Sequence, residues 1–155
     1  MAATSLIPEL DEIVKNGSAE KRAAAITKLA ELFVQGSSIF GPQHVELFDG
    51  ILIGLVPAAE PAARASVATR FASLSNAPPG VVNYLAREDE IRIAGPILSR
   101  SPLINEELLM EIARAKGQAH LAAISERDTL AAPLTDVILR RADREVVRVL
   151  ALSLG

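Results

Sequence analysis

Apolar residues recur at the three- and four-residue spacing of amphipathic helices along almost the whole chain. The interruptions fall at Gly, Pro, Asn and Ser, which favour turns and helix ends. This pattern predicts helices over residues 5–15, 18–36 and 42–55, and a fourth from Pro61 to the break at 76–80. No segment convincingly resembles a strand, so an all-helical chain is expected.

The second half of the chain repeats itself with a step of 27 and then 26 residues. Three sets of apolar positions correspond: Leu85, Ile112 and Ile138; Ala94, Leu121 and Val147; and Ile97, Ile124 and Leu150. Each repeat is predicted to be a first helix (81–87, 108–114 or 134–140), a turn at Glu90, Gly117 or Asp143, and a second helix. A period of this length is typical of helix pairs that stack because one pair cannot bury its own apolar face.

We therefore predict an all-α fold, an α-solenoid of about five antiparallel helix pairs with a HEAT- or armadillo-like superhelix. Residues 1–155 form one domain, with irregular repeats over 1–78 and regular 26–27-residue repeats over 79–155. Leu152, close to Leu154, stands where the earlier repeats have Ser99 and Glu126. Because an apolar edge of a stack needs cover, we expect either a longer natural protein or self-association through this C-terminal edge.

Two segments carry a family resemblance: Ala94 to Leu103 (AGPILSRSPL) and, one repeat later, Ala123 to Arg127 (AISER). They resemble a largely alphaproteobacterial helical-repeat family of unknown function, related in style to HEAT and leucine-rich-variant repeats. The resemblance is best over residues 80–155. It implies an all-helical repeat fold and brings no catalytic residues with it.

Composition narrows the class of protein. Half of the residues are apolar but only five are aromatic, so Ala, Leu, Ile and Val must build the core, as suits close-packed helices. The absence of cysteine excludes disulfides, thiolate metal sites and cysteine nucleophiles. We expect a cytoplasmic protein, because the first residues lack a signal-peptide pattern and no apolar run approaches the ~20 residues of a membrane span.

The net charge of −3 is unevenly distributed. Residues 1–60 carry four basic and eight acidic side chains, whereas residues 61–155 carry twelve and eleven. A nucleic-acid-binding protein would show a clearer basic excess, so a nucleic-acid partner is not expected.

The usual signatures of catalysis are missing: the sequence has no phosphate-binding loop, no His-Glu-x-x-His and no Gly-x-Ser-x-Gly. His44 should lie at the surface near a helix start. His120 corresponds to Ile93 and Val146, so we expect a packing role with a hydrogen bond to a neighbour. We therefore predict no enzyme, no metal and no cofactor.

Two other features leave alternatives open. Arg87, Arg114 and Arg140 recur once per repeat, and a favourable charge at helix C-termini explains them better than a basic rail for phosphate or an acidic peptide. Pro96 lies inside a second helix and should bend it; a ligand site at the freed carbonyl is the other reading.

Second helices commonly line the concave side of helical-repeat stacks, where partners bind. The positions facing away from the buried row give the predicted partner-binding residues: Arg92, Ser99, Ala122, Glu126, Glu145 and Arg148. Small residues there allow close approach, and mixed charges would fix the register of the partner. The predicted function is a non-enzymatic protein or peptide interaction scaffold along this surface. The alternative is a nucleic-acid-binding helical repeat that uses the Arg-rich C-terminal half.

Overall fold

The computed structural model describes residues 12–13 and 15–154, with the side chains of all of these except Leu154, and every regular element in this part of the chain is helical. The helix predicted over 5–15 lies mostly outside the described residues. The first half contains α3 (Ala19–Gly36), α4 (Pro42–Leu55), a short 3₁₀ helix η1 (Val56–Ala58) and α5 (Pro61–Phe71). The second half contains α6 (Pro79–Ala86), α7 (Ile91–Arg100), α8 (Glu106–Ala115), α9 (Gln118–Ser125), α10 (Ala132–Arg141) and α11 (Arg144–Leu154).

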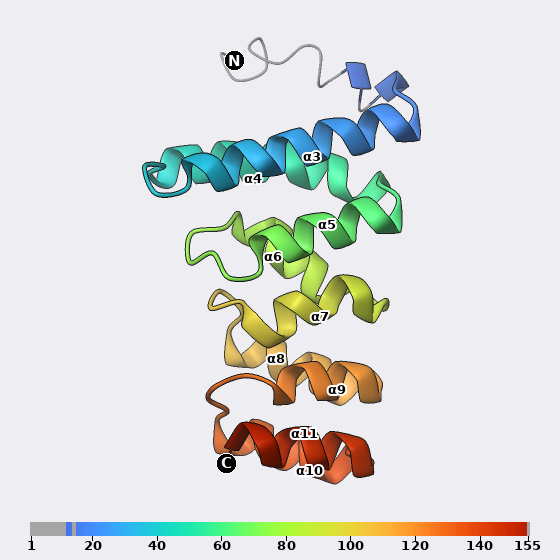
Figure 1. The fold of residues 1–155 in the computed structure, drawn as a ribbon, viewed down its shortest axis with the longest axis vertical. Helices are drawn as coiled ribbons and strands as arrows, with labels where there is room; N and C mark the ends of the chain where they lie inside the picture. Colours follow the sequence, from blue (N-terminus) through green and yellow to red (C-terminus); the bar gives the residue numbers. More distant parts are fainter. Residues whose placement is uncertain (1–11, 14, 155) are drawn as a thin grey trace.

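The helices follow one another along the longest axis of the molecule (Figure 1). One layer consists of α3, α5, α7, α9 and α11, each packed on the next. In the other layer, α4 packs on α6 and α8 packs on α10. None of the described helices is both long and apolar enough to cross a membrane.

Polar side chains at the predicted boundaries determine where the helices begin. Ser18 caps α3, with Oγ accepting from the Lys21 amide at 3.2 Å. Asp143 accepts from the Val146 amide at 2.9 Å in the first turn of α11. Asp49 of α4 reaches a different helix and accepts from the Gly80 and Val81 amides at 3.1 and 2.9 Å, so it also joins α4 to α6.

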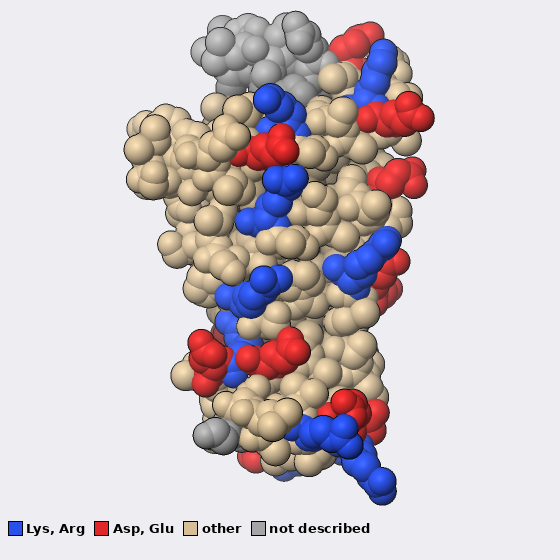
Figure 2. Space-filling model, viewed as in Figure 1, with Lys and Arg blue, Asp and Glu red and all other residues tan. Residues whose placement is uncertain are grey.

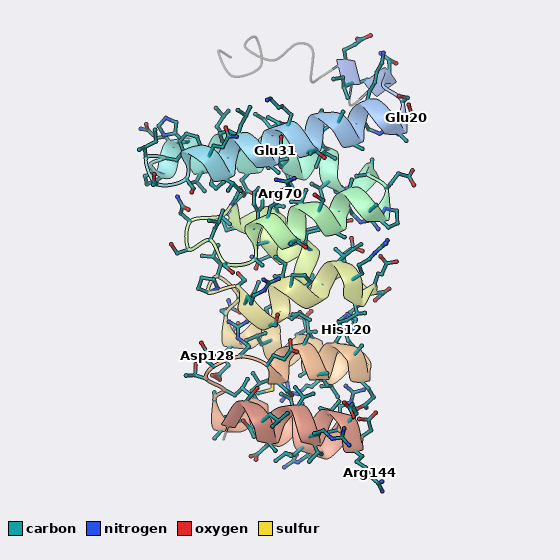
Figure 3. All side chains as sticks on the ribbon, in the orientation of Figure 1. Glu20, Glu31, Arg70, His120, Asp128 and Arg144 are labelled. Carbon is teal, nitrogen blue, oxygen red and sulfur yellow. The ribbon has the colours of Figure 1, made fainter. Side chains whose placement is uncertain are left out.

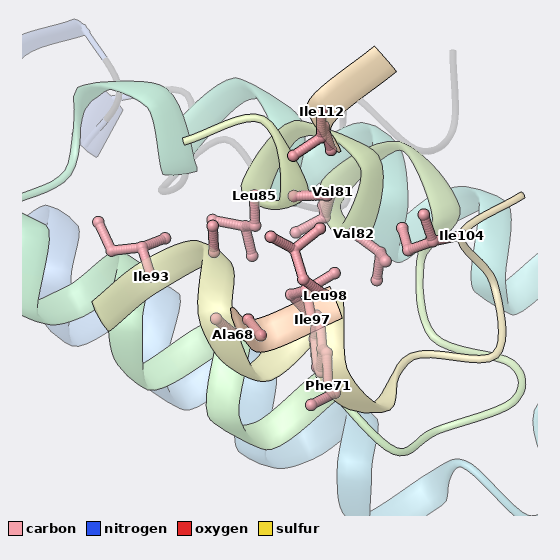
Figure 4. Packing of buried hydrophobic residues seen from close by; sticks show 14 of the residues in the cluster. Ala68, Phe71, Val81, Val82, Leu85, Ile93, Ile97, Leu98, Ile104 and Ile112 are labelled. Atoms are coloured by element: carbon pink, nitrogen blue, oxygen red, sulfur yellow. The ribbon is translucent and has the colours of Figure 1, made fainter. Parts of the chain in front are cut away.

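The core lies between the two layers and is made almost entirely of aliphatic side chains (Figure 4). Five of the six residues in the triplets of Leu85 and Ile97 are at most 2% exposed, and Leu150 is 3% exposed. The third triplet is different, because Ala94 and Leu121 are fully buried but Val147 is 43% exposed. The reason is that α9 covers α7 and α11 covers α9, whereas no described helix packs on the corresponding face of α11.

Candidate functional site

An open groove of about 480 Å³ lies between α7 and α9, and three of the six predicted partner-binding residues line it: Ser99, Ala122 and Glu126. The remaining lining residues are Ile91, Gly95, Pro96, Arg100, Ala119 and Ala123. The groove therefore lies on the second-helix surface that the repeat register indicates.

The groove follows from the spacing of residues on the two helices. On α7, Ile91, Gly95 and Ser99 stand four residues apart and so share one face, beside the buried row of Ala94 and Leu98. On α9 the facing positions are mostly alanines. Because glycine and alanine have little or no side chain, α7 and α9 can pack against each other and still leave a hollow between their outer ridges.

Pro96 places an irregularity in the wall of this groove. It lies inside α7 and has no amide hydrogen, so the Arg92 carbonyl lacks the donor that residue 96 would otherwise supply. Ser99 Oγ donates to the Gly95 carbonyl at 3.0 Å, which occupies the serine within its own helix. The freed Arg92 carbonyl is thus an acceptor on the helix that forms the groove wall. It fits both interpretations of Pro96, a bend in the helix and a ligand site at the freed carbonyl.

One end of the groove is charged. Ser99, Arg100 and Glu126 also line a second hollow of about 450 Å³, which extends over Asp128 and Thr129. Arg100 and Glu126 are exposed, and within the described part of the chain neither takes part in an ion pair. A partner can therefore meet an apolar, small-residue floor at one end and charges of both signs at the other.

Arg127 anchors this charged end. Its guanidinium donates to the Leu98 and Ser101 carbonyls, both at 2.6 Å, and so ties the end of α9 to the end of α7. Burial lowers the pKa of Arg127 below its ordinary value. The side chain is engaged inside the molecule, so its role at the groove is to hold the two helices in place.

The other three predicted residues do not line the groove. Arg92 follows Ile91 in the sequence, so it lies off the helix face that Ile91 and Gly95 share. Its guanidinium forms an ion pair with the Glu90 carboxylate at 3.1 Å. Arg148 pairs with Glu145 at 3.4 Å within α11, and both are exposed. The structure thus brings three of the six together and leaves three as surface charges on α7 and α11.

Sequence reasoning missed several lining residues, among them the two at the ends of α7. Ile91 is the first residue of α7, and Arg100 is the last. The four-residue spacing between Ile91 and Gly95, which places both on one helix face, could have indicated Ile91. Nothing in the repeat register distinguishes Arg100.

Both histidines are where the sequence places them. His120 is 5% exposed, and its Nε2 lies 2.8 Å from the Glu88 carbonyl oxygen, so the packing role is confirmed (Figure 3). His44 is exposed at the start of α4, where its Nδ1 accepts from the Gly41 amide at 3.1 Å. Among residues 12–13 and 15–154, no three His, Asp or Glu side chains converge to hold a metal ion.

The three arginines of the predicted ladder have different surroundings. Arg87, at the C-terminal end of α6, forms an ion pair with Glu111 of α8, whereas Arg114 and Arg140 are exposed in the last turns of α8 and α10. Hydrogen bonding to Arg87 lowers the pKa of Glu111, and the same bond raises the pKa of Arg87. Figure 2 shows basic and acidic side chains interspersed with wide uncharged areas on the visible face.

Comparison with known proteins links the groove region to a bacterial family. Residues 93–153 match the family described as "Uncharacterised protein conserved in bacteria (DUF2336)". The matched residues begin inside α7 and end inside α11, so they include most of α7 and all of α9. No curated protein and no solved structure matched the chain.

Proposed function

We propose that this chain is a non-enzymatic interaction scaffold, a cytoplasmic α-solenoid of the HEAT-like kind, and that it binds a protein or peptide in the groove between α7 and α9. The observation that carries the proposal is the meeting of Ser99, Ala122 and Glu126 in one open hollow. These residues come from two helices and were selected by the repeat register alone. The serial packing of α3, α5, α7, α9 and α11 supports the solenoid.

The chemistry of the groove suggests what a partner offers. Gly95, Ala119 and Ala122 allow a peptide backbone or a helix to approach closely, which places apolar side chains of the partner against Ile91. Arg100 and Glu126 would then pair with charges at one end and set the direction of the bound segment. Few aromatic residues are available as anchors, so we expect an affinity in the micromolar range, about −8 kcal/mol.

Fewer observations support the alternative function, nucleic-acid binding. Arg127 and Arg141 donate to backbone carbonyls, and Arg87, Arg92 and Arg148 pair with carboxylates. These contacts reduce the basic charge that the C-terminal half presents to a phosphate backbone. A phosphate-binding surface would in addition lose orders of magnitude in affinity between about 50 and 200 mM salt.

The proposal is tested by selecting peptides from a random displayed library on the wild-type chain and measuring their affinity for two variants. Ala119→Trp fills the groove, whereas Ala115→Trp alters an equally small, exposed position on α8 that does not line it. We expect at least one selected peptide to bind about tenfold more weakly, some 1.4 kcal/mol, to Ala119→Trp and unchanged to Ala115→Trp.

Three results would contradict this function. The first is a selection that yields no binding peptide. The second is binding that Ala119→Trp leaves intact. The third is salt-sensitive binding of random DNA or RNA in preference to any peptide, which would favour the alternative.

A further inference from the structure

A separate hollow of about 510 Å³ lies where the loop between α3 and α4, the helix α4 and the loop between α5 and α6 meet. Both loops lie on the same side of the molecule in Figure 1. Apolar side chains form much of the wall, among them Phe40 from the first loop, Val45 from α4 and Leu103 from the segment after α7. We call this site the loop hollow. Its volume is within the roughly 300–1,000 Å³ of small-molecule sites, and it shares no lining residue with the groove between α7 and α9.

Contacts between the two loops hold the walls of the loop hollow in place. The Phe40 ring packs over Gly36, where an added Cβ would collide with it, and it stacks on the Phe48 ring with the centroids 5.3 Å apart. The Asn76 side-chain amide donates to the Ser37 carbonyl at 2.8 Å, which joins one loop to the other. The hollow is therefore preformed, and a ligand does not have to order its walls on binding.

The charged residues that line the loop hollow are both acids. Glu46 and Asp49 stand three residues apart on α4, so their carboxylates share one face of the helix. Asp49 accepts from the Gly80 and Val81 amides, which fix its position but carry no formal charge, and Glu46 is exposed. Within the described part of the chain neither acid forms an ion pair, and no Lys, Arg or His lines the hollow. An apolar wall thus meets negative charge that no lining residue neutralises.

We propose that the loop hollow binds a small amphipathic amine, with its ammonium group beside Glu46 and its apolar part against Phe40, Val45 and Leu103. The carboxylates attract a cation and repel an anion of the same shape, so the charge of the site selects the class of ligand. A lysine side chain of a protein partner has related chemistry but fills only part of this volume, which favours a free ligand. The inference is independent of the groove between α7 and α9 and of what binds there.

Titration of the labelled chain with phenethylamine, followed by amide chemical shifts, tests the proposal. This probe is a cation at neutral pH and carries an apolar ring. The matched probe is 3-phenylpropionate, which has the same ring on a chain of similar length and the opposite charge. We expect phenethylamine to shift the amides of Phe40, Val45, Glu46 and Ala77 with a Kd of about 1 mM, and 3-phenylpropionate to bind about tenfold more weakly.

Two pairs of variants separate the charge of the site from its shape. Glu46→Gln should weaken phenethylamine binding about threefold, as expected for an ion pair at an exposed carboxylate. Glu20→Gln is its control, since Glu20 is exposed at the end of α3 that lies opposite the loop into α4 (Figure 3). Ser75→Trp should fill the hollow and abolish the shifts, whereas Ser38→Trp alters an exposed serine that does not line it and should leave them unchanged.

Several outcomes would overturn the amine site. They are equal binding of phenethylamine and 3-phenylpropionate, binding that Glu46→Gln leaves unchanged, and the absence of shifts around the loop hollow at several times the expected Kd. A capped lysine peptide that binds there more tightly than phenethylamine would also overturn it, because the occupant would then be a basic segment of a protein.

Discussion

At the scale of single residues, four arginines of the second half illustrate two different uses of the guanidinium group. Arg127 and Arg141 donate to backbone carbonyls of earlier helices, at 2.6 Å in each bond. Arg87 and Arg92 pair with carboxylates at the surface. A helix leaves its last carbonyls without partners, and a planar guanidinium with several donors can satisfy two of them at once. The first group therefore joins helices that are distant in sequence.

Arg127→Lys should lower the free energy of unfolding by about 1–2 kcal/mol, because an ammonium keeps the charge but loses the fork that spans both carbonyls. Urea unfolding followed by circular dichroism measures the difference. Arg140→Lys is the matched control at an exposed position and should change stability by no more than about 0.5 kcal/mol. Equal effects of the two substitutions would show that the bonds to Leu98 and Ser101 do not stabilise the fold.

Two surface carboxylates give stability a dependence on pH. Hydrogen bonding to Lys116 and its charge lower the pKa of Asp89, and Arg87 lowers the pKa of Glu111. A lowered pKa means that the folded chain binds fewer protons than the unfolded chain in acid. The stabilisation is therefore present near neutral pH and is lost as the pH falls below the ordinary carboxyl values of 3.8 and 4.5.

The double variant Asp89→Asn/Glu111→Gln should consequently show a shallower loss of stability across that acid range than the wild type. Unfolding curves at a series of pH values measure the slope. Because both carboxylates are at the surface, added salt should reduce the difference between the two proteins. Parallel pH profiles at low salt would contradict the assignment.

Some features of single residues could be predicted from the sequence, and others could not. The start of the helix at residue 18 and the packing role of His120 were predicted, because helix-end signals are local and a repeat register is periodic. The bonds of Arg127 and Arg141 could not be predicted, because they depend on which carbonyls of a preceding pair come within reach. The ion pair of Arg87 with Glu111 could not be predicted either, because the repeat register aligns helices but does not determine where the ends of long side chains lie.

At the scale of elements, α4 is distinguished by two exposed glycines, Gly50 in its interior and Gly54 in its last turn. An added Cβ would meet no atom within 4 Å at Gly50 or at Gly54, and neither has a positive φ. Glycine in a helix interior is less favourable than alanine by roughly 0.5–1 kcal/mol. Because a Cβ has room at both positions, no close approach within the described chain requires a glycine there. These positions weaken α4 as an isolated helix.

Gly50→Ala and Gly54→Ala should therefore each raise the free energy of unfolding by about 0.5–1 kcal/mol. Gly36→Ala is the opposite case, because its Cβ would collide with the Phe40 ring, and it should destabilise the protein. Thermal or urea unfolding of the three variants measures these changes in stability. A loss of stability at Gly50 or Gly54 would mean that α4 packs against something at this face.

The order and kind of the elements were largely predictable, since Gly117 and Asp143 mark the turns before α9 and α11 as expected. The short η1 was not, because its sequence reads as a turn between Pro57 and Pro61. The groove was half predicted. The register found the face that carries Ser99 and Ala122, but it could not show that Arg148 of α11 lies outside the hollow.

At the scale of the whole molecule, the two layers give the protein distinct surfaces. The groove opens on the layer of α7 and α9, and the exposed face of α11 that holds Val147 lies at one end of the described series of packed helices. Val147 shows why sequence alone could not separate these surfaces: its position is buried in two repeats and exposed in the third. Periodicity identifies a packing position, but the presence of a covering helix is a property of the assembled fold.

The proposed function makes the groove between α7 and α9 the place where a partner binds. Amide chemical-shift mapping by NMR tests this most directly, using the labelled chain and a peptide selected on the wild type. If a partner binds in the groove, the amides of Gly95, Ser99, Ala119 and Ala122 shift most, with little change in α3 and α4. Shifts concentrated on the hollow around Phe40 and Val45, or spread evenly over the chain, would contradict it.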